Sequence, residues 1–261
     1  MSSSIPTILA LDFDGVICDG ILEYFQTTKR TYCKIWDLDN IESLDQFAEL
    51  FYPLRPVIET GWEMPVLLRA LVLGISSQEI SQNWPRVAAK IVTTEKLDPK
   101  FLSYELDATR DQWIESNLDE WLALHRFYPG VVENLDKILH SPTQLYIIST
   151  KEGRFIQQLF QEKGVKIPNN TLFGKETKQP KYEIIRTILK KHSETSSHLW
   201  FVEDLLKTLQ KVKQQPDLAE TGLFLADWGY NTQQTRESIA GDPSINLLTL
   251  AQFTQPFSNW R

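Results

Sequence analysis

Short apolar runs that read as buried strands lie at both ends of the chain, and a long segment between them carries no such strand signal. This arrangement constrains the fold most. One run covers residues 8–11, and others cover 145–148, 199–202 and 223–226, with a shorter one at 171–173. Between the later runs, apolar residues recur three and four positions apart, which is typical of helices. Buried strands that alternate with helices predict an α/β fold in which helices cover both faces of a parallel sheet.

The segment from residue 21 to residue 126 carries no strand pattern. Leu67, Leu68, Leu71 and Val72 recur on one helical face, and prolines divide or kink the helices of this region. Since a helical segment of this size needs its own core, we expect a second domain inserted into the first. The predicted organisation is an α/β domain from residues 1–20 and 127–261, with a helical domain at 21–126.

Composition excludes several classes of protein. An apolar content of 42% with 23% charged residues is ordinary for a globular protein, and no apolar segment approaches the roughly 20 residues that span a bilayer. The net charge of −7 argues against a nucleic-acid surface. The chain has only two cysteines, and its first residues do not have the pattern of a secretory leader. We therefore expect a cytoplasmic protein without membrane contact.

The first apolar run ends in Asp12 and Asp14, followed by a turn at Gly15. Ligands of parallel sheets bind beyond the carboxyl ends of the strands, and residues i and i+2 of a strand point the same way. Two neighbouring carboxylates favour a bound cation, and Mg²⁺ prefers such oxygen ligands. One carboxylate could attack phosphorus while the other transfers protons. The alternative is a pair of solvated acids beside a turn glycine.

Polar residues also follow two later runs. Ser149 and Thr150 follow the run at 145–148, where a hydroxyl and backbone N–H groups could hold a phosphoryl oxygen or could cap the next helix. Glu203 and Asp204 follow the run at 199–202, and two adjacent acids at that place are candidate metal ligands.

Two lysines lie near the start of the helix expected from residue 181. A lysine ammonium can neutralise charge between a carboxylate and a phosphate, although lysines are also common on surfaces. Lys181 is the first residue of the expected helix and is one candidate for this role. Lys178 is the alternative candidate because it precedes a proline-containing turn.

The segment LALDFDG, with the later polar residues in this order, resembles the haloacid dehalogenase (HAD) superfamily. The Trp-Gly-Tyr segment at 228–230 is similar to one in phosphoglycolate-phosphatase-like members. The resemblance implies a Rossmann-like HAD core, with the helical domain inserted after the first motif as a cap. It also implies that Asp12 is the nucleophile and Asp14 the acid/base. Because the dehalogenases lack this second aspartate, Asp14 favours phosphoryl transfer.

The resemblance assigns the remaining positions. It implies that Ser149 and Lys181 hold the phosphoryl group, with Gly15, Thr150 and Lys178 near the substrate. Mg²⁺ would be held by Asp12, the backbone carbonyl of Asp14, and Asp204. Thr208 stands where the family often has a later aspartate. Whether Glu203 is a metal ligand is therefore left undecided by the resemblance.

These observations predict an Mg²⁺-dependent phosphatase. It would hydrolyse a small phosphorylated metabolite through an aspartyl-phosphate, as a monomer or homodimer. One alternative on the same scaffold is a phosphomutase or a phosphonatase; the latter needs an imine-forming lysine, for which Lys29 and Lys34 are the candidates. The other alternative is a non-catalytic HAD-like binding module.

Overall fold

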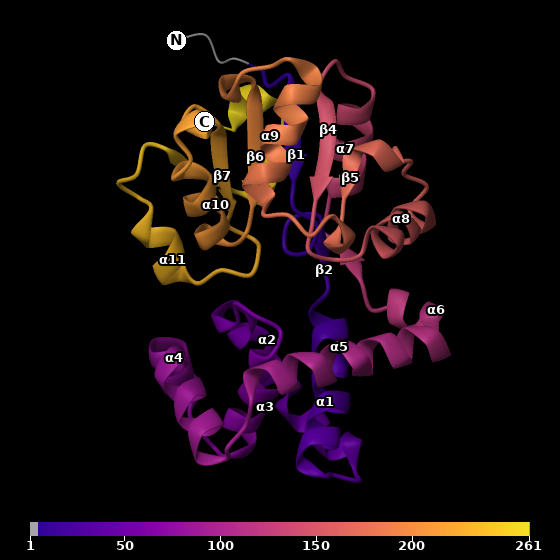
Figure 1. Cartoon of the computed structure of the whole chain (residues 1–261), viewed down its shortest axis with the longest axis vertical. Coiled ribbons are helices and arrows are strands. Elements are labelled where there is room, and N and C mark those ends of the chain that lie inside the picture. Colours follow the sequence, from indigo (N-terminus) through magenta and orange to yellow (C-terminus); the bar gives the residue numbers. More distant parts are fainter. Residues whose placement is uncertain (1–4, 261) are drawn as a thin grey trace. The chain divides into compact units, whose positions relative to one another are not determined.

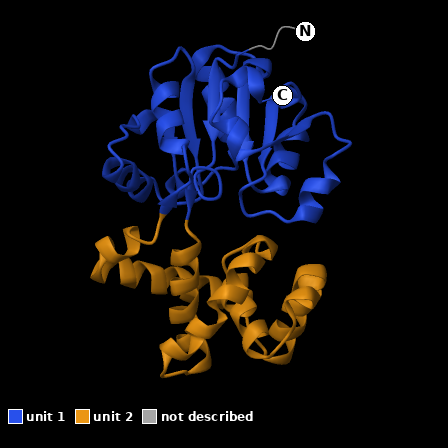
Figure 2. Ribbon diagram, turned by 180° about the vertical axis from the view of Figure 1, so that it is seen from behind, with its two compact units in different colours: residues 1–19, 126–261 blue, residues 20–125 orange. Residues whose placement is uncertain are grey.

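The computed structural model describes residues 5–260. The chain divides into two compact units, one formed by Met1–Asp19 with Arg126–Arg261 and the other by Gly20–His125 (Figure 2). The domain boundaries expected from the sequence lie one residue away from these on each side. The first unit is an α/β structure and the second is helical.

The first unit is built on a six-stranded sheet in which every neighbouring pair is parallel. The strand order is β5-β4-β1-β6-β7-β8, so β1 lies in the centre between β4 and β6. The strands are β1 (Ile8–Leu11), β4 (Gln144–Ile148), β5 (Leu172–Phe173), β6 (Leu199–Glu203), β7 (Gly222–Ala226) and β8 (Ile245–Leu248). The predicted parallel sheet is confirmed.

One strand of this sheet was not predicted. In β8, at the edge of the sheet, Ile245 and Leu248 are buried but Leu247 is 42% exposed. This strand also contains Asn246, which leaves it without the continuous apolar run that marked the central strands.

Helices cover both faces of the sheet (Figure 1). On one face, Ile8 and Ala10 share a core with Ile185 of α9 and Leu209 of α10. Strand geometry turns Leu9 and Leu11 to the other face. The helices of this unit are α7 (Val131–Leu139), α8 (Gly153–Glu162), α9 (Lys181–His192), α10 (Leu206–Lys213), α11 (Gln233–Ser238) and α12 (Leu250–Phe253).

The helical unit has its own hydrophobic core, as expected for an insertion of this size. Aromatic pairs such as Phe25 and Phe51, with ring centroids 5.2 Å apart, lie within it. Helix α4 is kinked at Asn83, two residues before Pro85. The helices are α1 (Ile21–Trp36), α2 (Ala48–Leu54), α3 (Glu63–Val72), α4 (Ser77–Thr94), α5 (Pro99–Ser116) and α6 (Leu118–Leu122).

A short antiparallel pair marks the places where the chain leaves the α/β unit and returns to it. In this pair, β2 (Cys18–Asp19) lies beside β3 (Arg126–Phe127), with Asp19 opposite Arg126. The two ends of the inserted segment therefore start from adjacent residues. No helix among residues 5–260 combines the length and apolar character that crossing a membrane requires.

Candidate active site

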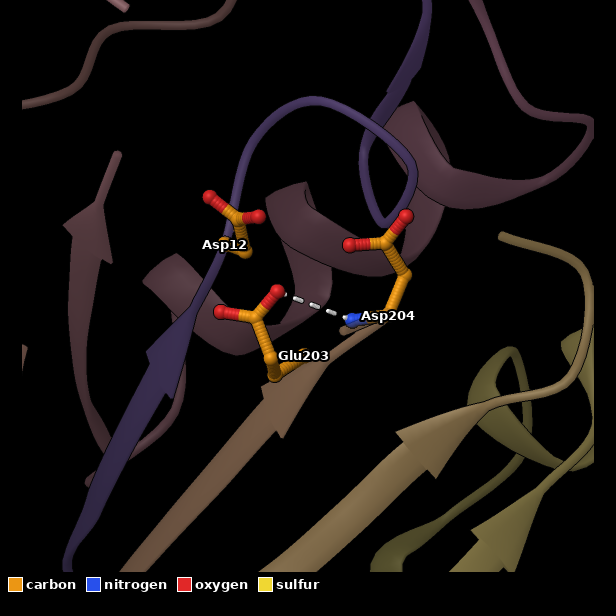
Figure 3. Close-up of side chains that lie close together, drawn as sticks. All are labelled: Asp12, Glu203 and Asp204. Carbon is orange, nitrogen blue, oxygen red and sulfur yellow. Dashed lines mark hydrogen bonds between the residues drawn. The ribbon is translucent and has the colours of Figure 1, made fainter. Parts of the chain in front are cut away.

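Three carboxylates meet where β1 and β6 end. Asp12 directly follows β1, Glu203 is the last residue of β6, and Asp204 comes next. Each offers an oxygen atom, and these atoms all lie within 4.8 Å of one another. Figure 3 shows the three side chains grouped at the ends of the two strands. The parallel pairing of Leu11 with Val202 brings these strand ends to the same edge of the sheet.

Lys181 lies among these acids. Its Nζ is 2.8 Å from Asp12 Oδ1 and 2.7 Å from Glu203 Oε2, and only 12% of its side chain is exposed. It is the first residue of α9, in the position that the sequence analysis favoured. Its rival Lys178 is exposed, in a left-handed backbone conformation with φ of 51°. The structure therefore places Lys181, and not Lys178, against the candidate nucleophile.

Burial controls the electrostatics of this cluster. Burial, followed by the charge of Glu203, raises the pKa of Asp12 well above its ordinary value, against the lowering effect of Lys181. Burial and the neighbouring Asp204 likewise raise the pKa of Glu203. Burial would lower the pKa of Lys181, but the charges of Asp12 and Glu203 raise it instead.

The donor set fits a divalent cation. Lys181 pairs with two of the three buried carboxylates, Asp12 and Glu203, so ionising all three leaves negative charge with little solvation. Oxygen ligands of this kind are those that Mg²⁺ takes in proteins. Asp12 and Asp204 are in the cluster as predicted, and Glu203 is in it too. For Asp14 the predicted metal ligand is the backbone carbonyl, and its side chain is not part of the carboxylate cluster.

Glu203 is also tied to Lys181. Its Oε1 accepts hydrogen bonds from the backbone N–H groups of Asp204 and Leu205, both 3.1 Å long, and its Oε2 accepts from Lys181. A fully buried carboxylate held in this way orients the lysine.

Two glycines and the 228–231 segment hold Asp204 in place. Asp204 Oδ2 accepts a hydrogen bond of 2.8 Å from the backbone N–H of Tyr230, and Asp204 O accepts one of 3.0 Å from Asn231 Nδ2. A Cβ atom on Gly15 would lie 2.1 Å from Asp204 Oδ2, and one on Gly229 would lie 2.3 Å from Asp204 Cβ. The Trp-Gly-Tyr segment thus shapes the acidic cluster.

The same segment is tied to the chain that follows Gly15. Trp228 Nε1 donates a hydrogen bond of 3.1 Å to Val16 O, and Tyr230 Oη donates one of 2.7 Å to Asp19 Oδ1. These contacts could not be predicted from the sequence because they join residues more than two hundred positions apart.

At the end of β4, Ser149 is buried and Thr150 is exposed. The backbone N–H of Ser149 donates to Phe173 O at 2.8 Å, and its Oγ accepts from the backbone N–H of Lys151 at 3.1 Å. Because β4 is the parallel neighbour of β1, Ser149 and Asp12 follow adjacent strands at the same edge of the sheet.

Lys151 is a further residue of the site that was not predicted from the sequence. Its Nζ lies 3.3 Å from Asp14 Oδ1, and the two side chains are 11% and 14% exposed. The sequence signal that could have identified Lys151 is its position three residues beyond β4, at the edge of the sheet where the other polar residues meet.

No family model matches the chain, and neither does any curated protein. Solved structures do resemble it. A predicted phosphatase from Clostridium acetobutylicum has a TM-score of 0.58 at 13% identity, covering 96% of this chain and 97% of that one. A predicted phosphoglycolate phosphatase from Haemophilus somnus has a TM-score of 0.55 at 14% identity, covering 90% and 92%.

A third similar structure is a hydrolase of the haloacid dehalogenase-like family from Streptococcus pneumoniae. Its TM-score is 0.54 at 15% identity, and the match covers 99% of this chain and 97% of that one. These three matches extend over nine-tenths or more of each chain, so they include both the sheet and the inserted helices. The chain therefore has the fold of the haloacid dehalogenase-like hydrolases, as its sequence motifs predicted.

Proposed function

We propose that the protein is an Mg²⁺-dependent phosphatase that hydrolyses a small phosphorylated metabolite through an aspartyl-phosphate. The observation that carries this proposal is the convergence of Asp12, Glu203 and Asp204, with Lys181 paired to the first two of these carboxylates. The phosphatases among the structures of similar fold support the same reaction class. We further propose a cytoplasmic protein that acts as a monomer or homodimer.

In the first step, an oxygen of Asp12 forms a bond to phosphorus, and the bond between phosphorus and the leaving oxygen breaks. The carboxyl group of Asp14 gives its proton to that oxygen. In the second step, Asp14 takes a proton from water, whose oxygen attacks phosphorus and releases Asp12 and inorganic phosphate. A carboxylate two residues from the nucleophile is suited to both proton transfers.

Lys181 and Ser149 would hold the transferring group. The ammonium of Lys181 favours the ionised form of Asp12, which burial alone disfavours, and offsets the charge of an incoming phosphate. The Ser149 hydroxyl accepts one hydrogen bond and can still donate its own hydrogen to a phosphoryl oxygen.

The metal would be held by Asp12, Asp204 and the backbone carbonyl of Asp14. When bound, Mg²⁺ supplies positive charge against the charge of phosphate and carboxylate. Glu203 holds Lys181 in this proposal, rather than serving as the principal metal ligand.

The test is release of inorganic phosphate from a panel of phosphorylated metabolites, with Mg²⁺ and with EDTA. We expect activity with Mg²⁺ only, none for Asp12→Asn, and a loss of about 10²–10⁴-fold for Asp14→Asn. The matched control is Asp136→Asn, which changes an exposed aspartate of α7 and should keep full activity. An active Asp12→Asn protein that is folded by circular dichroism would contradict the assignment.

The alternatives predict other results. A phosphonatase forms an imine between a lysine amine and its substrate, and borohydride would trap that imine. The candidate Lys29 is buried and paired with Asp45, which does not favour an accessible amine. Phosphate transfer between substrates without net release would indicate a phosphomutase. Binding of phosphorylated ligands without any turnover would support a non-catalytic module.

A further inference from the structure

We propose that Lys151 is a positioning residue that orients the Asp14 carboxylate for proton transfer. This inference rests on the proposed phosphatase function and adds a second lysine to it. Lys181 would serve the nucleophile Asp12, and Lys151 would serve the acid/base Asp14 from the neighbouring strand end.

The contact between these two residues is direct and shielded from solvent. Lys151 Nζ lies 3.3 Å from Asp14 Oδ1, with little of either side chain exposed. Within residues 5–260, Asp14 Oδ1 is buried and makes no hydrogen bond. A buried carboxylate oxygen in that state is costly, so the nearby ammonium supplies most of the attraction that holds its orientation.

The backbone of Lys151 is fixed on both sides. Its N–H donates to Ser149 Oγ at 3.1 Å, and its carbonyl oxygen accepts from the Lys175 N–H at 2.9 Å. Ser149 directly follows β4, and Lys175 lies just beyond β5. These two neighbouring strands therefore place the base of the Lys151 side chain.

The lysine has a specific task in this reaction. A carboxyl group that donates a proton to a leaving oxygen must lie within hydrogen-bond reach of it, and a misplacement of about 1 Å can cost 10²-fold in rate. Asp14 has a backbone that is held at the Gly15 turn, but its side chain can still rotate. The ammonium of Lys151, three residues beyond β4, would fix that rotation.

The competing role for Lys151 is direct binding of the substrate. A double-mutant cycle separates the two roles, because a residue that acts only through Asp14 has nothing further to lose once Asp14 is replaced. The variants are Lys151→Met, Asp14→Asn and the double variant, measured in the steady state for kcat and KM and in single turnovers with excess enzyme for the cycle. The substrate is the best metabolite from the phosphatase panel.

We expect Lys151→Met to lower kcat by roughly 10- to 100-fold while KM changes by less than about threefold. In the Asp14→Asn background the same change should alter the rate by less than about twofold. Lys151→Arg, which keeps the positive charge, should recover part of kcat. Lys163→Met, at an exposed lysine that follows α8, is the matched control and should behave as wild type.

The possible outcomes distinguish a failure of this inference from a failure of the proposed phosphatase function. Wild-type protein that releases no phosphate would overturn both. An active wild type with additive losses in the cycle, or with a change confined to KM, would overturn only the positioning role. If Lys151→Met does not fold by circular dichroism, Lys151→Gln replaces it. Equal activity of the Gln and Arg variants would then reject a role for the charge.

Discussion

At the scale of single residues, the site brings several carboxylates together where burial disfavours their ionised form. Asp12 and Glu203 keep raised pKa values because solvent is excluded, and Lys181 lies between them as the compensating charge. Asp204 is held differently, by a backbone N–H and by two glycines that leave no room for a side chain. The position of Asp204 therefore depends on the absence of two Cβ atoms.

Gly15→Ala is expected to impair metal binding and activity. The added Cβ would meet Asp204 Oδ2 at 2.1 Å, and the φ of 86° at this position strains any residue with a Cβ. We expect at least about a tenfold weaker response to Mg²⁺, measured by isothermal titration calorimetry and by phosphate release. Gly241→Ala is the control, because no atom lies within 4 Å of its added Cβ. Equal Mg²⁺ affinity in the two variants would contradict the packing argument.

At the scale of elements, one charged contact links helix α10 to the turn before β8. Lys213, the last residue of α10, lies 2.7 Å from Asp242 Oδ2, and Asp242 Oδ1 accepts from the Ser244 N–H at 3.0 Å. The hydrogen bond from Lys213, followed by those from Ser244, lowers the pKa of Asp242 to about 2. This contact helps to hold the edge strand, whose own apolar pattern is weak.

The pH dependence of Asp242→Asn tests this link. The folded-state pKa lies below the unfolded value of about 3.9, so the ionised Asp242 stabilises the fold above that pH. This contribution is lost as the pH falls from about 4 toward about 2, where both states become protonated. Because the pair is partly exposed, we expect less than about 1 kcal/mol at neutral pH.

Urea denaturation of wild type and Asp242→Asn at several pH values measures the difference in unfolding free energy. The difference should shrink as the pH falls through this window. Asp136→Asn, at an exposed aspartate of α7, supplies the baseline for removing a carboxylate. A difference that grows toward acid pH would show that the contact does not stabilise the folded state.

At the scale of the whole molecule, the chain is two units with separate cores. The carboxylate cluster, Lys181 and Ser149 all belong to the α/β unit. The inserted segment begins after Asp19 and ends before Arg126, and these residues pair with each other across β2 and β3. The ends of the insertion are thus already adjacent within the α/β unit.

Replacing residues 20–125 by a short Gly/Ser linker should leave the α/β unit folded. We expect one cooperative thermal transition and retained Mg²⁺ binding, because each residue of the carboxylate cluster remains. The same deletion with Asp204→Asn is the control and should lose the Mg²⁺-induced rise in melting temperature. An unfolded deletion protein would show that the α/β unit depends on the helical one.

Much of the fold followed from local patterns. The run at 8–11 and the later runs report burial on both faces, which is what a central parallel strand requires, so the sheet and the helical insertion could be predicted. The edge strand β8 could not, because half-buried Asn246 and exposed Leu247 separate its two buried residues and leave no continuous apolar run. The β2–β3 pair could not either, since two-residue strands carry no pattern of their own.

By itself, the sequence determined which polar residues stand at the strand ends, among them Asp12, Ser149 and Asp204. Only the tertiary structure decided which of them meet. It placed Lys181 rather than Lys178 against Asp12, and it brought Lys151 to Asp14. The reason is physical: side-chain periodicity reports each segment's own burial, whereas distances between segments depend on strand order and on where each helix begins.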